Sequence, residues 1–211
     1  MNNIPFFQTE YGVAALVLKE IPYQQTAYIT VLDAWDVEAL LDECKSFCRM
    51  CGAERVFATG HPSLETRPLY TEMWQLQCAQ EAIADTDAAL WPVQEETLEQ
   101  WRSIYNEKVR RLPNAAWMDQ RSARDMLAMG DGYFIHRGEQ LLGIGRASGD
   151  QIDWVASVEP GAGRDVVCAL AHALWTDTIK LTVASENPKA LALYDSLGFV
   201  KAKEISKWFE L

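Results

Sequence analysis

From Asp85 to the C-terminus, segments with the apolar periodicity of strands alternate with segments that have the periodicity of helices. This alternation restricts the fold more than any other feature of the sequence. The predicted strands cover residues 88–93, 132–136, 141–146, 151–158, 179–185 and 199–209. The predicted helices cover residues 97–112, 119–129, 164–175 and 188–197. This order of elements predicts an α/β fold with a mixed sheet and a hairpin turn at residues 137–139.

The N-terminal part has a shorter version of the same alternation. Its predicted strands cover residues 14–19, 27–32, 55–59 and 70–77. The sequence Val-Phe-Ala-Thr-Gly-His-Pro at residues 56–62 resembles Thr-Val-Ala-Ser-Glu-Asn-Pro at residues 182–188. A repeat of this kind predicts that residues 1–84 form a smaller, truncated copy of the α/β unit in residues 85–211.

Composition restricts the class of protein and its partners. Of the 211 residues, 49% are hydrophobic and 23% charged, which is typical of a globular protein. The formal net charge of −11 disfavours nucleic acid as a partner. It suits a small cationic substrate such as an amine, but a surface whose acidity only keeps the protein soluble explains it as well. No apolar run is long enough to span a membrane, and the N-terminus resembles no signal peptide. We therefore expect a cytoplasmic location.

Three of the five cysteines have C-x3-C-x2-C spacing: Cys44, Cys48 and Cys51. This spacing also holds the iron–sulfur cluster of radical enzymes that use S-adenosylmethionine. Here, however, the cysteines share one helical face with four apolar residues: Val37, Leu40, Leu41 and Phe47. Asp33 or Asp36 is expected to cap this helix at its start, and Gly52 suits its end. The pattern favours three reduced, packed thiols over a cluster.

A specific pattern spans the last predicted helix and the residues next to its two ends. Counting from Asn187, residues 187–199 have asparagine, alanine, leucine-tyrosine and glycine-phenylalanine at positions 0, 3, 6–7 and 11–12. Taken one at a time, an asparagine there is an ordinary helix cap and a tyrosine an ordinary packing residue. The combined spacing resembles the GNAT superfamily of acyl-CoA-dependent N-acetyltransferases at its fifth strand and following helix. The resemblance covers residues 85–211 and implies a GNAT-like fold.

The resemblance implies a site for acetyl-CoA between two strands. In the family the fourth and fifth strands, here residues 151–158 and 179–185, are parallel and splay apart, and pantetheine lies in the gap. Backbone amides near Ser157 and Val158 would then contact pantetheine and polarise the thioester carbonyl. The resemblance therefore implies acetyl-CoA (coenzyme A) as the co-substrate.

The resemblance also assigns roles on the last helix. Tyr194 would donate a proton to the leaving thiolate of CoA, because a phenol is protonated at neutral pH. Asn187 would hydrogen-bond pantetheine or orient the start of the helix. The implied reaction is direct transfer of an acetyl group to a primary amine of a small molecule or protein.

The turn that would bind the pyrophosphate departs from the family pattern. Gly161, Gly163, Arg164 and Val166 occupy the region where the family has Gln/Arg-x-x-Gly-x-Gly/Ala, and they are the candidates for pyrophosphate binding. Asp165 places a negative charge in the same turn and could itself satisfy the helix amides.

This departure keeps a second hypothesis open, in which the chain is a catalytically silent GNAT-like module for binding or dimerisation. The general base is also unassigned: Asp153 and Glu159 are the nearest carboxylates to the predicted thioester site. The three histidines, which have no metal-ligand spacing, are His61, His136 and His172. No metal is predicted, and whether the chain forms a homodimer is left open.

Overall fold

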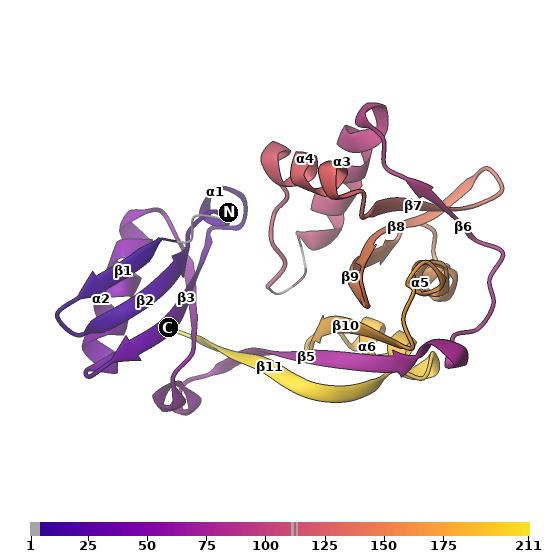
Figure 1. The fold of residues 1–211 in the computed structure, drawn as a ribbon. Helices are drawn as coiled ribbons and strands as arrows, with labels where there is room; N and C mark the ends of the chain where they lie inside the picture. The colour runs from indigo at the N-terminus through magenta and orange to yellow at the C-terminus, as the bar shows by residue number, and fades with distance from the viewer. Residues whose placement is uncertain (1–4, 111, 113) are drawn as a thin grey trace. The chain divides into compact units, whose positions relative to one another are not determined.

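A computed structural model describes residues 5–110, 112 and 114–211 (Figure 1). Of these, the residues up to Met73 together with Ile205–Leu211 form one compact unit, and Trp74–Glu204 form a second. The divisions fall inside two long strands, β5 (Leu69–Ala79) and β11 (Val200–Glu210), so both strands contribute to both units. The sequence repeat predicts a domain boundary at residue 84, and that boundary stays a prediction. Within the described ranges, no helix is long and apolar enough to cross a membrane.

The first unit is a sheet with strand order β1-β2-β3-β4-β11 packed against helix α2. Strands β1, β2 and β3 are antiparallel to one another, β3 and β4 are parallel, and the end of β11 pairs antiparallel with β4. Its elements before β5 are β1 (Phe6–Thr9), β2 (Gly12–Val17), α1 (Ile21–Gln24), β3 (Thr26–Ala34), α2 (Val37–Met50), β4 (Arg55–Thr59) and the 3-10 helix η1 (Pro62–Thr66). The predicted strands and helix are confirmed. The short β1, α1 and η1 were not predicted, because four or five residues show no clear periodicity.

The second unit has strand order β11-β5-β10-β9-β8-β7-β6. Its remaining elements are η2 (Gln80–Ala82), β6 (Ala89–Pro92), η3 (Glu95–Thr97), α3 (Leu98–Val109), α4 (Gln120–Met129), β7 (Gly132–Arg137), β8 (Gln140–Ser148), β9 (Gln151–Ser157), α5 (Gly163–His172), β10 (Thr178–Ala184) and α6 (Pro188–Ser196). Every strand and helix predicted from Asp85 onward is present, with ends that differ by at most three residues. The predicted hairpin turn joins β7 to β8, and Gly138 in it has a positive φ of 57°.

Two hydrophobic clusters hold helices on opposite faces of this second sheet (Figure 1). On one face, α3 and α4 pack through Trp101, whose indole Nε1 donates to the Tyr133 carbonyl at 2.9 Å. On the other face, α5 lies so close to β8 that a Cβ added at Gly145 would be 2.4 Å from Leu170 Cδ1. Gly145 therefore allows α5 to approach the sheet.

The structure contains the repeat that the sequence predicts. In each unit a helix joins two parallel strands, β3-α2-β4 in the first and β9-α5-β10 in the second. Each pair is followed by a helix that begins with proline, at Pro62 and Pro188, and then by a strand of 11 residues. Within the first unit β4 neighbours β11, and within the second β10 neighbours β5. Each unit is thus completed by a long strand from the other half of the sequence.

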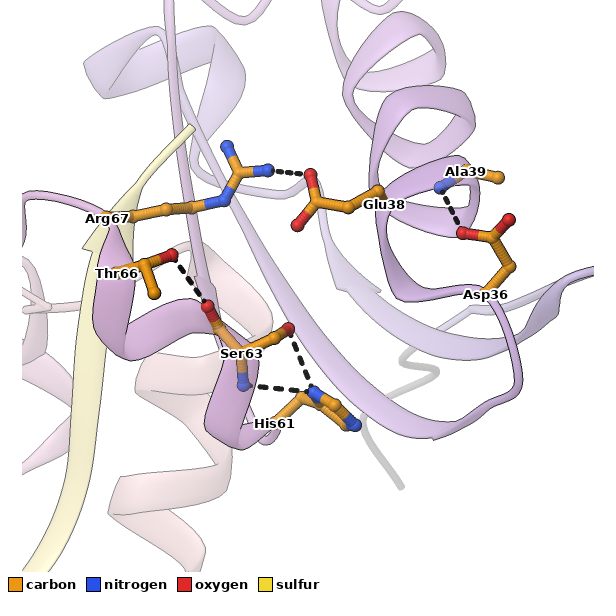
Figure 2. Close-up of polar contacts among 7 residues, drawn as sticks. All are labelled: Asp36, Glu38, Ala39, His61, Ser63, Thr66 and Arg67. Atoms are coloured by element: carbon orange, nitrogen blue, oxygen red, sulfur yellow. Dashed lines mark hydrogen bonds and ion pairs between the residues drawn. The ribbon is translucent and has the colours of Figure 1, made fainter.

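The cysteine-bearing helix α2 is a packed helix, as predicted. Asp36 caps it by accepting a hydrogen bond from the Ala39 amide at 3.1 Å (Figure 2). Cys44 and Cys48 are fully buried, but Cys51 is exposed, so the prediction for this last position is wrong. Cys51 is the C-cap residue, where the helix no longer faces the sheet. Among the described residues, no three His, Cys, Asp or Glu side chains are placed to hold a metal ion.

A shift from about pH 8 to about pH 11 should destabilise the first unit. Burial raises the pKa of the Cys44 thiol from 9.0 to about 12 and that of Cys48 to about 11. In the unfolded chain both thiols lose their protons near pH 9, so above that pH the folded state binds more protons and the free energy of unfolding falls. The melting temperature of Cys44→Ala should therefore fall less steeply over this range than that of the wild type. Equal slopes for Cys44→Ala and the wild type would contradict the assignment.

Candidate acyl-CoA site

The parallel strands β9 and β10 diverge soon after they begin. They pair at only two positions, Lys180 with Gln151 and Leu181 with Ile152. Beyond these pairs, β9 continues to Ser157 and β10 to Ala184 with no further pairing between the two strands, all of whose residues are described. Main-chain groups along this opening have no strand partner within the sheet, so they can hydrogen-bond an extended ligand.

One of the two amides predicted to face this opening does so. The Val158 amide donates to the Leu142 carbonyl of β8 at 2.8 Å, and the Glu159 amide donates to the same oxygen at 3.1 Å. Because successive amides of a strand point to opposite edges, the Ser157 amide points away from β8, toward β10. This corrects the expectation for Val158, whose amide is already paired within the sheet.

The first turn of α5 begins beside the end of β9. Gly161 has a φ of +84°, which favours glycine, and a Cβ added there would meet no atom within 4 Å. Ala162 is the N-cap and supplies no side-chain cap. Among the described residues, no group accepts a hydrogen bond from the amides of Gly163, Arg164 or Asp165. Free amides at a helix N-terminus attract anions, because the helix dipole adds to their hydrogen bonds.

Asp165 does not cap these amides. Its Oδ2 forms an ion pair with Arg137 Nη2 at 2.9 Å, and its Oδ1 accepts a hydrogen bond from Thr86 Oγ1 at 3.1 Å. The expectation that Asp165 satisfies the helix amides is therefore wrong. Arg137 and Thr86 were missed from the sequence, because they lie far from Asp165 along the chain and belong to no motif.

Tyr194 lies on α6, with 7% of its surface exposed. Its ring packs beside Phe199, with 5.8 Å between the centroids. Burial raises the pKa of the Tyr194 phenol from 10.0 to about 12, so the hydroxyl is protonated at neutral pH. No group among the described residues forms a hydrogen bond with this hydroxyl. The phenol is therefore protonated and has no hydrogen-bond partner among the described residues.

Asn187 caps α6, since its Oδ1 accepts a hydrogen bond from the Ala190 amide at 3.2 Å. The corresponding residue of the first unit is His61, which caps η1 through a bond from the Ser63 amide to its Nδ1 (Figure 2). Of the two roles expected for Asn187, it therefore fulfils that of orienting the start of the helix.

No family model and no curated protein sequence matches the chain, but solved structures do. A functionally unknown conserved protein from Staphylococcus epidermidis ATCC 12228 is similar with a TM-score of 0.61 and 10% identity, over 99% of this chain and 93% of that chain. A GNAT-family acetyltransferase from Colwellia psychrerythraea has a TM-score of 0.51 and 13% identity, over 98% and 84%. A tandem GNAT protein from the clavulanic acid biosynthesis pathway has a TM-score of 0.52 and 12% identity, over 96% and 81%. The chain has the GNAT fold.

In GNAT terms, β9 and β10 are the fourth and fifth strands, and the two units are the two lobes. The N-terminal lobe lacks the opening seen in the C-terminal one. There, β3 and β4 pair at five consecutive positions, from Thr26 with Arg55 to Thr30 with Thr59. These pairs occupy all of β4, so its main-chain groups are not free along the edge that faces β3.

Some residues predicted for the GNAT cofactor site have other roles. Val166 is fully buried, packs against β8 and donates its amide to the Ala162 carbonyl at 3.0 Å. Val166 therefore packs the first turn of α5 against the sheet, whereas Arg164 is exposed on that turn. Asp153, a candidate base, accepts a hydrogen bond from Ser148 Oγ at 3.0 Å near the start of β9.

Proposed function

We propose that the chain is an acyltransferase that moves an acetyl group from acetyl-CoA to a primary amine by direct attack. The observation that supports this most is the divergence of β9 and β10, which leaves the Ser157 amide without a partner among the described residues, close in sequence to the uncapped first turn of α5. Pantetheine would lie along the opening and the pyrophosphate on the free amides of Gly163 and Arg164. The neighbour from Colwellia psychrerythraea is called an acetyltransferase of the GNAT family, and the name of the tandem neighbour refers to AcCoA.

The reaction needs three contributions from the protein. The amine nitrogen attacks the thioester carbonyl carbon, and negative charge develops on the carbonyl oxygen, where the Ser157 amide would stabilise it. The carbon–sulfur bond then breaks, and the electron pair leaves with the sulfur. Tyr194 would give this thiolate its proton. The acidic surface of the protein, with a net charge of −11, favours the approach of a cationic amine.

Acetyl-CoA at about 100 times its dissociation constant should raise the melting temperature. Ligand binding to the folded state alone would add about 2.7 kcal/mol of stability at that concentration. For a chain of this size, that corresponds to a rise of roughly 5–10 °C, measured by differential scanning calorimetry. No rise at millimolar acetyl-CoA would overturn the proposal.

Two glycine-to-alanine variants distinguish an effect on acetyl-CoA binding from the effect of backbone strain. Gly161 and Gly149 both have positive φ, 84° and 59°, and neither has an atom within 4 Å of an added Cβ. Replacing either by alanine should therefore cost about 1 kcal/mol of backbone strain. Only Gly161→Ala should reduce the rise caused by acetyl-CoA, because Gly149 lies in the turn between β8 and β9. Equal loss of the rise in both variants would contradict the placement of the pyrophosphate.

A further inference from the structure

The first turn of α5 contains an acidic residue at a position where a carboxylate normally competes with a bound anion for the helix amides. Asp165 is the third residue of the helix, and a carboxylate at that position commonly reaches back to the amide of the N-cap residue. It does not do so here: the N-cap amide, of Ala162, donates to the Glu159 carbonyl at 3.3 Å. Among the described residues, the amides of Gly163, Arg164 and Asp165 have no acceptor, although a carboxylate lies in the same turn.

Two side chains bind Asp165 and account for its orientation. Arg137, the last residue of β7, binds Asp165 Oδ2 through Nη2 at 2.9 Å and binds Asp87 Oδ1 through Nε at 2.7 Å. Thr86 Oγ1 donates to Asp165 Oδ1 at 3.1 Å and accepts from the Ala88 amide at 3.2 Å. Both carboxylate oxygens of Asp165 are thus engaged by groups outside α5.

We infer that Arg137 is a positioning residue for acyl-CoA, which holds the Asp165 carboxylate away from the amides that would bind the pyrophosphate. This inference rests on the proposed function. Without Arg137, the carboxylate would be free to turn back toward the amides of Gly163 and Arg164, and its charge would no longer be neutralised by a cation. Both effects would weaken pyrophosphate binding. The carboxylate would compete for the amides, and its charge would repel the phosphates.

Because these residues are partly exposed, replacing them should not unfold the protein, so the inference can be tested with folded variants. The side chains of Arg137 and Asp165 are 44% and 27% exposed. Ion pairs at such sites contribute little to folding stability. Arg137→Met should therefore leave the melting temperature nearly unchanged and act on ligand binding alone.

Isothermal titration at low ionic strength tests the inference with two probes, CoA and pantetheine, which lacks the pyrophosphate. In Arg137→Met the dissociation constant of CoA should rise about threefold or more, and that of pantetheine should stay the same. Adding Asp165→Asn to this variant should restore CoA binding, because the competing charge is then absent. Arg121→Met removes the same charge from an exposed position on α4 and should leave both constants unchanged.

The outcomes separate this inference from the proposed function. If the wild type binds CoA and Arg137→Met binds it equally well, the inference is overturned but the proposed function is not. The same holds if pantetheine binding weakens as much as CoA binding, or if Asp165→Asn fails to restore affinity. Should Arg137→Met not fold, Asp165→Asn by itself must bind CoA at least as tightly as the wild type, and weaker binding would overturn the inference. A wild type that does not bind CoA would overturn the proposed function and the inference with it.

Discussion

Tyr194→Phe should lower kcat about 100-fold and leave the dissociation constant of CoA nearly unchanged. The substitution keeps the ring that packs beside Phe199 and removes only the hydroxyl. That hydroxyl has no hydrogen-bond partner among the described residues, so its loss should cost little folding stability. Steady-state assays with acetyl-CoA and an amine acceptor, together with calorimetric titration of CoA, measure the two quantities separately.

The N-terminal lobe supplies a matched control for this experiment. Tyr28 and Tyr194 are both 7% exposed, and Tyr28 lies on β3 of the other unit. Tyr28→Phe should leave kcat at the wild-type value. If Tyr194→Phe weakens CoA binding as much as it lowers kcat, Tyr194 packs the site and does not donate a proton.

The pH dependence of kcat gives a second test of the same role. Because burial raises the pKa of Tyr194 to about 12, the phenol stays protonated from about pH 7 to about pH 10. The ratio of wild-type to Tyr194→Phe turnover should therefore be constant over this range. A ratio that falls toward 1 near pH 9 would mean that the proton donor ionises there, which contradicts a buried phenol of such high pKa.

The sequence predicts the C-terminal lobe well because its signals are local. Asn187 caps α6, Pro188 begins it and Gly198 follows it with a φ of +85°. Each of these residue types is selected by the backbone geometry of one or two neighbouring positions. The boundaries of α6 and the place of Tyr194 on it therefore follow from a few residues, without knowledge of the rest of the chain.

Features that depend on distant partners could not be predicted in the same way. Periodicity identifies β5 and β11 as strands, but it does not say that β11 neighbours β4 within the first lobe or that β10 neighbours β5 within the second. The pairing of the Val158 amide with Leu142 depends on the register of β8 and β9, which no short motif specifies. The neutralisation of Asp165 likewise depends on Arg137, which the hairpin between β7 and β8 brings to α5.

Trp101→Ala should cost about 3–5 kcal/mol of folding stability, the largest effect expected from any single truncation in the second unit. Trp101 is fully buried between α3 and the sheet, and its ring lies 5.4 Å from that of Tyr105 and 5.9 Å from that of Trp154 on β9. Truncation would leave a cavity and remove the hydrogen bond that the indole Nε1 donates to the Tyr133 carbonyl.

Trp175 is the matched control for this truncation, because it is the same residue type in the same unit and is 100% exposed. Trp175→Ala should change stability by no more than about 0.5 kcal/mol. Urea unfolding followed by circular dichroism would measure both variants, and the melting temperature of Trp101→Ala should fall by roughly 10 °C. Similar losses in the two variants would contradict the assignment of Trp101 to the core. A large loss confined to Trp101→Ala would support it, because only the buried tryptophan packs α3 against the sheet.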